Sequence, residues 1–348
     1  MKVIGFDSWT QGAHHYLRLV DTFKAKGIEL ILIHLGSWGT EKGRPEKEMI
    51  GNLEVRDIAY YNRKSFSEII ESENPSAVIF LSTHTFSHRA FNRYIRYRNI
   101  PSIHLYHGLV RVQAVVGSDS PYKPNLIHRL KFATSQLPRA LKYVWPAYAR
   151  ALWETGATAG EWSRFGYDIV SGAMGMHSKT VADDARTNGC CIYAAADIEN
   201  AVQRYGYARE KVFVVGNPDL IHFGLTTDMI GSKLALPLVD RSDVMYVDTG
   251  LVYVGGFAFQ SKEEFVQHMV DTKNQLEQQG RHLIFKPHPQ HLMNDDILSD
   301  LIAAGVDICS NQDFLSRLQR CCACIVEPTS LSVVPALMGM PLLLANYG

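Results

Sequence analysis

The 348-residue sequence has no long apolar run, no net charge and few cysteines, and each absence excludes a class of protein. No uninterrupted apolar stretch approaches the roughly 18 residues that a membrane-spanning helix needs. Lys and Arg number 35, and so do Asp and Glu, so the whole-chain charge does not point to nucleic acid as a partner. Residues 1–7 predict a first strand and not a signal peptide. A chain of this length without a membrane span is expected to form two globular domains.

The six cysteines do not form a metal-binding pattern. They are Cys190, Cys191, Cys309, Cys321, Cys322 and Cys324. Cys321 and Cys324 have C-x-x-C spacing, but no second pair is spaced for zinc. Most lie in or beside apolar runs, which predicts reduced, packed thiols in a cytoplasmic protein. We therefore expect no bound metal and no cofactor.

The neutral total hides an uneven distribution of charge. Residues 84–150 contain eleven Lys or Arg and a single acid, Asp119, which leaves 24 basic against 34 acidic residues elsewhere. The window thus carries +10 and the rest of the chain −10. Between residues 126 and 153, basic and aromatic side chains alternate, and Pro138 and Pro146 are expected to break the stretch into short helices. This composition suits contact with an anionic membrane, but it suits interdomain packing or solvated helix faces about as well.

Strands and helices alternate on both sides of a polar stretch. Residues 3–6 predict a strand, 11–15 a glycine-bearing loop, 16–26 an amphipathic helix and 29–35 a second strand. The glycine spacing is not G-x-G-x-x-G, so there is no dinucleotide fingerprint. After a polar linker, residues 244–247 begin a second series of the same kind. The expected fold class is α/β, with two Rossmann-like domains at residues 1–222 and 240–348.

Two polar clusters follow predicted strands in the second domain. Residues 283–285 run into Lys286-Pro287-His288-Pro289, and residues 323–326 run into Glu327-Pro328-Thr329-Ser330 at a predicted helix start. Ligands of open α/β sheets bind beyond the carboxyl ends of the strands, and a helix start favours an anion. Lys286, His288, Thr329 and Ser330 suit a phosphate, and Glu327 suits ribose hydroxyls. The competing readings are a polar strand end without a ligand and simple helix capping.

These clusters, followed by Gly339-Met340-Pro341, resemble the C-terminal half of GT-B glycosyltransferases of bacterial capsule and lipopolysaccharide biosynthesis. Most similar are the enzymes that use CMP-sugars, namely Kdo and sialic acid transferases, and the CDP-glycerol glycerophosphotransferases. The resemblance implies two Rossmann-like domains facing a cleft and a metal-independent transferase. Its implied partners are a nucleotide-sugar donor and a polysaccharide or lipid-linked acceptor. Since GT-B domains normally continue with a further helix, we expect the native chain to extend beyond Gly348.

The resemblance also suggests roles for residues outside the two clusters. It places Gly12, His14, His15 and His107 at the acceptor side of the cleft. It makes Asp248, which ends the strand at 244–247, a candidate nucleophile for a retaining reaction. Glu161, in Gly160-Glu161-Trp162, is a weaker candidate acid or base that the resemblance does not supply. Ordinary loop histidines, a packed His107 and turn or surface carboxylates remain the alternatives.

Three function classes fit the sequence. A sugar transferase, with a CMP-Kdo-like donor favoured, comes first. A CDP-glycerol-type glycerophosphotransferase and a non-catalytic nucleotide-binding module are the alternatives. An epimerase is disfavoured because the carboxylate-rich first-domain site expected of one is not evident. The expected location is the cytoplasm, at the inner face of the cell membrane.

Overall fold

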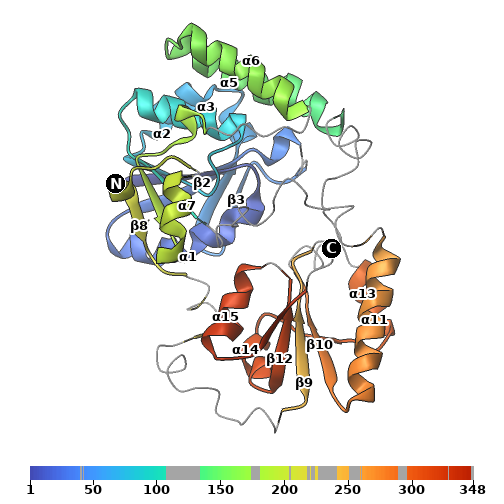
Figure 1. Ribbon diagram of the computed structural model, residues 1–348. Helices are drawn as coiled ribbons and strands as arrows, with labels where there is room; N and C mark the ends of the chain where they lie inside the picture. Colours follow the sequence, from blue (N-terminus) through green and yellow to red (C-terminus); the bar gives the residue numbers. More distant parts are fainter. Residues whose placement is uncertain are drawn as a thin grey trace. The chain divides into compact units, whose positions relative to one another are not determined.

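The computed structural model forms two compact units, each described here by itself (Figure 1). It describes residues 1–39, 41, 43–106, 134–173, 181–203, 205–217, 220, 224–225, 241–250, 259, 261–288, 296–327 and 329–345. Among these residues, the division falls between Gly216 and Asn217. Of the linker predicted at about residues 220–241, the described residues are Leu220, Gly224, Leu225 and Arg241.

The first unit is built on a sheet with the strand order β3-β4-β2-β1-β5-β6-β7-β8 among the described residues. Its strands are β1 (Lys2–Asp7), β2 (Glu29–His34), β3 (Lys47–Ile50), β4 (Leu53–Asp57), β5 (Ala77–Phe80), β6 (Ser102–Leu105), β7 (Gly189–Ile192) and β8 (Val212–Val214). Neighbours pair in parallel, except that β3 is antiparallel to β4. The chain adds β2, β3 and β4 on one side of β1 and then returns to place β5 on the other side. The topological switch point therefore lies between the carboxyl ends of β1 and β5.

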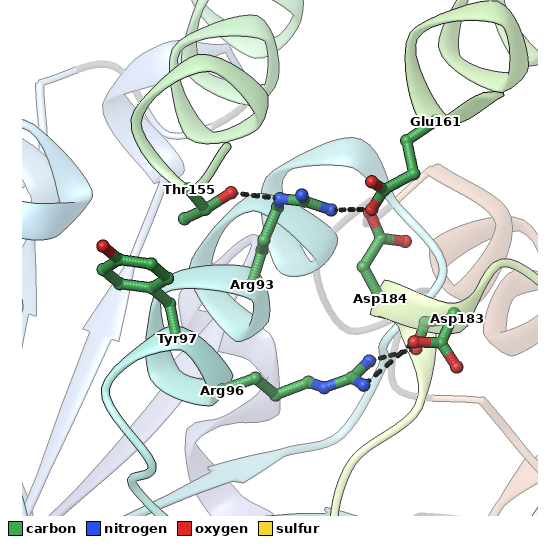
Figure 2. Close-up of a pocket in the computed structure, with 7 residues that line it drawn as sticks. All are labelled: Arg93, Arg96, Tyr97, Thr155, Glu161, Asp183 and Asp184. Atoms are coloured by element: carbon green, nitrogen blue, oxygen red, sulfur yellow. Dashed lines mark hydrogen bonds and ion pairs between the residues drawn. The ribbon is translucent and has the colours of Figure 1, made fainter. Parts of the chain in front are cut away.

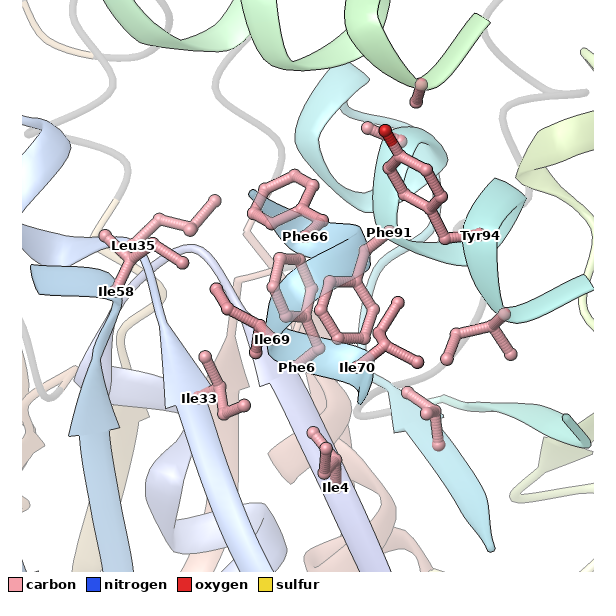
Figure 3. Close-up of a cluster of buried hydrophobic side chains, with 14 of the residues drawn as sticks. Ile4, Phe6, Ile33, Leu35, Ile58, Phe66, Ile69, Ile70, Phe91 and Tyr94 are labelled. Carbon is pink, nitrogen blue, oxygen red and sulfur yellow. The ribbon is translucent and has the colours of Figure 1, made fainter. Parts of the chain in front are cut away.

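Helices cover both faces of this sheet, because its strands bury side chains on both faces. They are α1 (Ala13–Ala25), α2 (Phe66–Glu73), α3 (Phe86–Tyr97), α5 (Trp145–Glu154), α6 (Ala159–Ala173) and α7 (Ile198–Gln203). Along β1, Val3 belongs to the hydrophobic cluster that includes side chains of α1, whereas Ile4 and Phe6 belong to the cluster that includes side chains of α2 and α3. Figure 3 shows Phe6 among the latter side chains, and its ring stacks on Phe91 at 4.1 Å.

The prediction that two prolines separate short helices is wrong. Residues 134–154 are helical throughout, with a π-helical stretch at Ala140–Val144 between Pro138 and Pro146. Pro146 stands in the first turn of α5, where a missing backbone N–H is tolerated.

The second unit repeats the same winding in a parallel sheet, with the order β11-β10-β9-β12-β13 among the described residues. Its strands are β9 (Asp243–Val247), β10 (His282–Lys286), β11 (Asp307–Ile308), β12 (Cys321–Val326) and β13 (Leu342–Leu344). Its helices are α11 (Lys262–Gln278), α13 (Asp296–Ala303), α14 (Phe314–Leu318) and α15 (Val333–Leu337), with a 3-10 turn, η10, at Ser330–Ser332. The chain fills one side of β9 before crossing to β12, so the switch point lies between β9 and β12. The predicted α/β class with two Rossmann-like units is confirmed.

Candidate functional site

The carboxyl ends of β10, β9 and β12 lie side by side and bring the predicted residues together. Lys286 pairs with Val247, and Val247 pairs with Val326, in the parallel registers of the three strands. The next residues along two of these strands are Asp248 and Glu327, which flank the switch point. The sequence therefore predicted correctly that these residues follow the carboxyl ends of strands, although it did not show that β9 would lie between β10 and β12.

Asp248 holds the Lys286–His288 turn in place. Its Oδ2 accepts a hydrogen bond from the backbone N–H of His288 at 3.0 Å, and its own N–H donates to the carbonyl of Lys286 at 3.1 Å. Asp248 is only 4% exposed. In this structure the carboxylate acts as a clamp between β9 and β10.

Glu327 joins β12 to β9 in the same way. It is fully buried, and its carboxylate accepts from the Tyr246 hydroxyl at 2.8 Å and from the backbone N–H and hydroxyl of Thr249. Burial raises the pKa of Glu327, and the nearby charge of Asp248 adds to the rise. Sequence reasoning missed Tyr246 and Thr249, which have no motif of their own.

Lys286 is also buried, and its ammonium donates to the carbonyl of Pro287 at 3.2 Å. Burial lowers the pKa of Lys286, while the neighbouring Cys309 and Asp248 act in the opposite direction. Lys286, Asp248 and Glu327 thus form a buried layer. The half-buried His288, Thr249 and Thr329 lie at the same strand ends, where a ligand can reach them.

The cluster after β12 begins a shorter helical segment than the sequence suggested. Ser330 opens the 3-10 turn η10, and α15 that follows has five residues. The Thr329 hydroxyl accepts from the N–H of Leu331 at 3.2 Å, and its carbonyl accepts from the Ser332 hydroxyl at 2.6 Å. Thr329 therefore performs the local capping considered as the alternative, and a strong helix-dipole contribution is not expected from one short turn.

Glu161 belongs to the first unit, where it lines a pocket of about 210 Å³ (Figure 2). It accepts from the backbone N–H of Thr158 at 2.8 Å at the start of α6, and it pairs with Arg93 of α3. The Arg93 guanidinium lowers the pKa of Glu161 to about 2. A carboxylate that is ionised at all working pH values is poorly suited to acid–base catalysis, so these contacts support a structural role.

Three of the predicted acceptor residues follow β1, one in a 3-10 turn and two in helix α1, although the sequence predicted a loop for all three. Gly12 ends the turn η1 (Thr10–Gly12), and an added Cβ there would lie 2.2 Å from Oδ2 of Asp7, so the position needs glycine. His14 and His15 stand in the first turn of α1, with ring centroids 3.8 Å apart. His107 lies outside the described residues.

The first unit also has a carboxylate cluster that sequence reasoning missed. At the ends of β1, β2 and β4, Nδ1 of His34 lies 3.3 Å from Asp57 and 3.6 Å from Glu41, and Thr10 donates to Glu41. Burial, with a contribution from Glu41, raises the pKa of Asp7 to about 7. One signal was available: residues 3–8 (VIGFDS) and 244–249 (VMYVDT) have the same pattern, which places Asp7 where Asp248 stands in the second unit. The reason given above for disfavouring an epimerase is therefore wrong.

No protein-family model and no curated protein matches this sequence. Several solved structures resemble this chain weakly in backbone fold. S. aureus MnaA with UDP has 12% identity and a TM-score of 0.48, over 99% of this chain and 78% of that one. The UDP-GlcNAc 2-epimerase from Neisseria meningitidis has 11% identity and a TM-score of 0.42, over 99% and 82%. The wall teichoic acid polymerase TagF has 12% identity and a TM-score of 0.45, over 98% and 69%. Nothing about the activity of this chain follows from likeness at this level.

Proposed function

We propose that this protein is a glycosyltransferase of the GT-B type that binds a nucleotide-activated donor at the carboxyl edge of the second sheet. The observation that carries the proposal is the convergence of β9, β10 and β12 at a switch point. There a buried layer of one cation and two carboxylates fixes the turn that carries His288. Such rigid support is what a binding site requires to hold a ligand in one geometry.

In this proposal, His288, Thr329 and Ser330 contact the donor phosphate, and the charge of Lys286 attracts it from the layer beneath. Glu327 orients Thr249 at the ribose side. These groups supply positive charge and hydrogen-bond donors for a leaving phosphate without a metal. A CMP-Kdo-like donor and a bacterial surface polysaccharide or lipid-linked acceptor are the favoured substrates. A CDP-glycerol donor would use the same site.

Replacing His288 with alanine is expected to weaken CMP binding by roughly 1–3 kcal/mol, the scale for a hydrogen bond to a charged group. Isothermal titration calorimetry measures this directly. The matched control is His282→Ala, at the other end of β10, where the side chain pairs with Asp307 at 3.1 Å. Equal CMP affinity in wild type and His288→Ala would contradict the assignment of the site.

The product formed from candidate donors distinguishes the reaction classes. Purified protein is incubated with CMP-, UDP- and CDP-linked donors, and the products are separated by mass and configuration. Free sugar indicates a sugar transferase, glycerol phosphate indicates the glycerophosphotransferase, and an epimerised nucleotide sugar indicates an epimerase. Nucleotide binding without turnover indicates a non-catalytic module.

We also propose that the first unit contacts the anionic inner face of the cell membrane through the basic window at residues 84–150, together with the exposed aromatic side chains that follow it in α5 and α6. No described residue lies in a helix long and apolar enough to cross a bilayer. Exposed positions of α6 include Trp162, Tyr167 and Val170. Figure 1 shows α6 on the outside of the unit beside α5, where Trp153 is 79% exposed. Exposed aromatic side chains next to a basic stretch, here the helical residues 134–150, are typical of proteins that bind at a membrane interface.

Vesicles containing anionic lipid are therefore expected to co-sediment the protein at low salt and to release it at high salt. Lys142→Glu, on the exposed helix before α5, should weaken binding by about 2 kcal/mol, since each cation near an anionic surface contributes about 1 kcal/mol and the substitution reverses a charge. Lys211→Glu, an exposed lysine before β8, is the matched control. If anionic vesicles bind no more protein than neutral vesicles at low salt, this surface is simply solvated.

A further inference from the structure

Two pockets of the first unit meet at Arg96, near the end of α3, and the proposed function uses neither. The first, of about 210 Å³, is the pocket that Glu161 lines (Figure 2). The second, of about 340 Å³, is lined by Arg96, Asn99, Ile100, Pro101 and Asn188. Residues 99–101 precede β6 and Asn188 precedes β7, so the second pocket lies at the amino ends of strands. Ligands of this fold class bind at the opposite, carboxyl ends, so the two pockets lie outside that edge.

Ion pairs between α3 and later elements form the walls of the first pocket. Arg93 donates from Nε to the Thr155 hydroxyl and from Nη1 to the carboxylate of Glu161. Arg96 donates to the carbonyl of Asp183 at 2.6 Å and pairs with its carboxylate at 2.9 Å. Figure 2 shows both guanidiniums extending from α3 toward these partners. Each guanidinium at the pocket wall therefore stands beside a carboxylate.

The described charges around the first pocket balance. Its lining contains two guanidiniums and three carboxylates, and the third carboxylate, Asp184, pairs with the guanidinium of Arg89 at 2.7 Å. An anion would be repelled by the carboxylates and a cation by the guanidiniums. A sugar hydroxyl suits such a wall, because it can donate to a carboxylate and accept from a guanidinium at the same time. Tyr97, 64% exposed, adds an aromatic ring on which the apolar face of a sugar can pack.

The second pocket has chemistry of the same kind. The side-chain oxygen of Asn188 accepts from the backbone N–H of Ser102 at 2.9 Å, which fixes an amide at the pocket wall. Asn99 supplies a second amide, and the side chains at 100–101 supply an apolar surface. Because Arg96 lines both pockets, consecutive units of one sugar chain can occupy them in succession.

We propose that the two pockets form a glycan site, which binds an uncharged segment of an oligosaccharide with one sugar unit in each pocket. The ion pairs stay in place, because a guanidinium has more N–H donors, and a carboxylate more acceptor positions, than one pair uses. In a transferase, this site would hold a part of the polysaccharide acceptor that does not react. That role rests on the proposed function, whereas the binding of an oligosaccharide does not.

Maltooligosaccharides and chitooligosaccharides, from the monosaccharide to the trisaccharide, are the probes, and saturation-transfer NMR and calorimetry measure their binding. The trisaccharide is expected to bind at least about tenfold more tightly than the monosaccharide of the same series, because it can fill both pockets. It should also slow hydrogen exchange at residues 96–102 and 183–190. Absence of binding by every probe, or equal affinity for monosaccharide and trisaccharide, overturns the proposal.

Arg96→Ala removes the side chain that both pockets share and should weaken trisaccharide binding by at least about tenfold. Arg98→Ala is the matched control, with an expected change of less than about twofold. Arg98 follows the same helix and pairs with Glu71, but it is not among the described residues that line either pocket. Asn99→Gly removes a side chain of the second pocket at a position with φ of 56°, which glycine tolerates, and should reduce the advantage of the trisaccharide. Equal trisaccharide affinity in wild type and Arg96→Ala overturns the proposal.

Two further measurements separate binding from folding and from the proposed function. Arg96→Ala and Arg98→Ala should unfold at similar temperatures, because each loses a partly exposed ion pair. Tyr97→Ala leaves the ion pairs in place and should weaken trisaccharide binding by at least about fivefold, so it tests the glycan site even if Arg96→Ala is unstable. Trisaccharide binding by a protein that does not bind CMP contradicts the proposed function and supports the glycan site, and CMP binding without trisaccharide binding does the reverse.

Discussion

Replacing Glu327 with alanine is expected to lower the free energy of unfolding of the second unit by about 3–5 kcal/mol. The substitution leaves a cavity in a fully buried position and removes the acceptor for the Tyr246 hydroxyl and the Thr249 N–H. All 5 tryptophans precede Asn217, so tryptophan fluorescence reports on the first unit. Hydrogen exchange of the β9 and β12 amides reports on the second. Protection should fall in β9 and β12 while the tryptophan transition stays at the same denaturant concentration.

Glutamine at position 327 is the matched control. Its amide oxygen can accept from Thr249 and its amide nitrogen can donate to the Tyr246 hydroxyl, so the expected loss is less than about 1 kcal/mol. The raised pKa of Glu327 gives a second readout. The stability that follows from a raised pKa is fully present below the ordinary value of 4.5 and is lost as pH rises through the folded pKa. Wild type should therefore lose stability relative to Glu327→Gln with rising pH. Equal stability of Glu327→Ala and wild type would contradict the clamp assigned to this residue.

The sequence was sufficient to predict the α/β class and the strand ends of the second unit. Apolar runs ending in polar clusters, as at Lys286 and Glu327, identify strands and their carboxyl ends from local information alone. The order of strands in the sheet is not local. That β9 lies between β10 and β12 depends on how the chain crosses from one side of the sheet to the other. Because β9 is the middle strand, Asp248 can contact His288 after β10, and Thr249 can contact Glu327 after β12.

The first unit shows what local patterns miss. Asp7, His34, Glu41 and Asp57 are spread over fifty residues without a recognisable motif, and they become neighbours only because β1, β2 and β4 are adjacent in a parallel sheet. Glu161 illustrates the opposite error. The residues next to Glu161 in the sequence suggested a carboxylate without an ionic partner. Its partner, Arg93, lies sixty-eight positions away in the sequence and contacts Glu161 only through tertiary packing. Pairing of this kind fixes the charge state and cannot be inferred from spacing.

Replacing Asp248 with asparagine is expected to abolish transfer while nucleotide affinity changes by less than about twofold, roughly 0.4 kcal/mol. The expectation follows from the proposal that Asp248 is the nucleophile of a retaining reaction. Asparagine keeps an oxygen that can accept from the N–H of His288, so the turn that binds the nucleotide stays in place. Its amide cannot attack the anomeric carbon. Turnover and calorimetry on the same preparation measure both quantities, and mass spectrometry of the wild type with donor tests for a covalent sugar adduct.

Alanine at the same position separates chemistry from positioning. It removes the acceptor for the His288 N–H, so it should weaken nucleotide binding as well as transfer, whereas asparagine should affect transfer alone. The physical argument against Asp248 as the nucleophile is burial: because the residue is 4% exposed, the sugar would have to reach the layer beneath His288. Near-normal turnover of Asp248→Asn together with weak nucleotide binding by Asp248→Ala would make Asp248 a positioning residue that acts through His288. The reacting base would then be sought in the first unit, where His14 and His15 begin α1 and Asp7, with a pKa of about 7, ends β1.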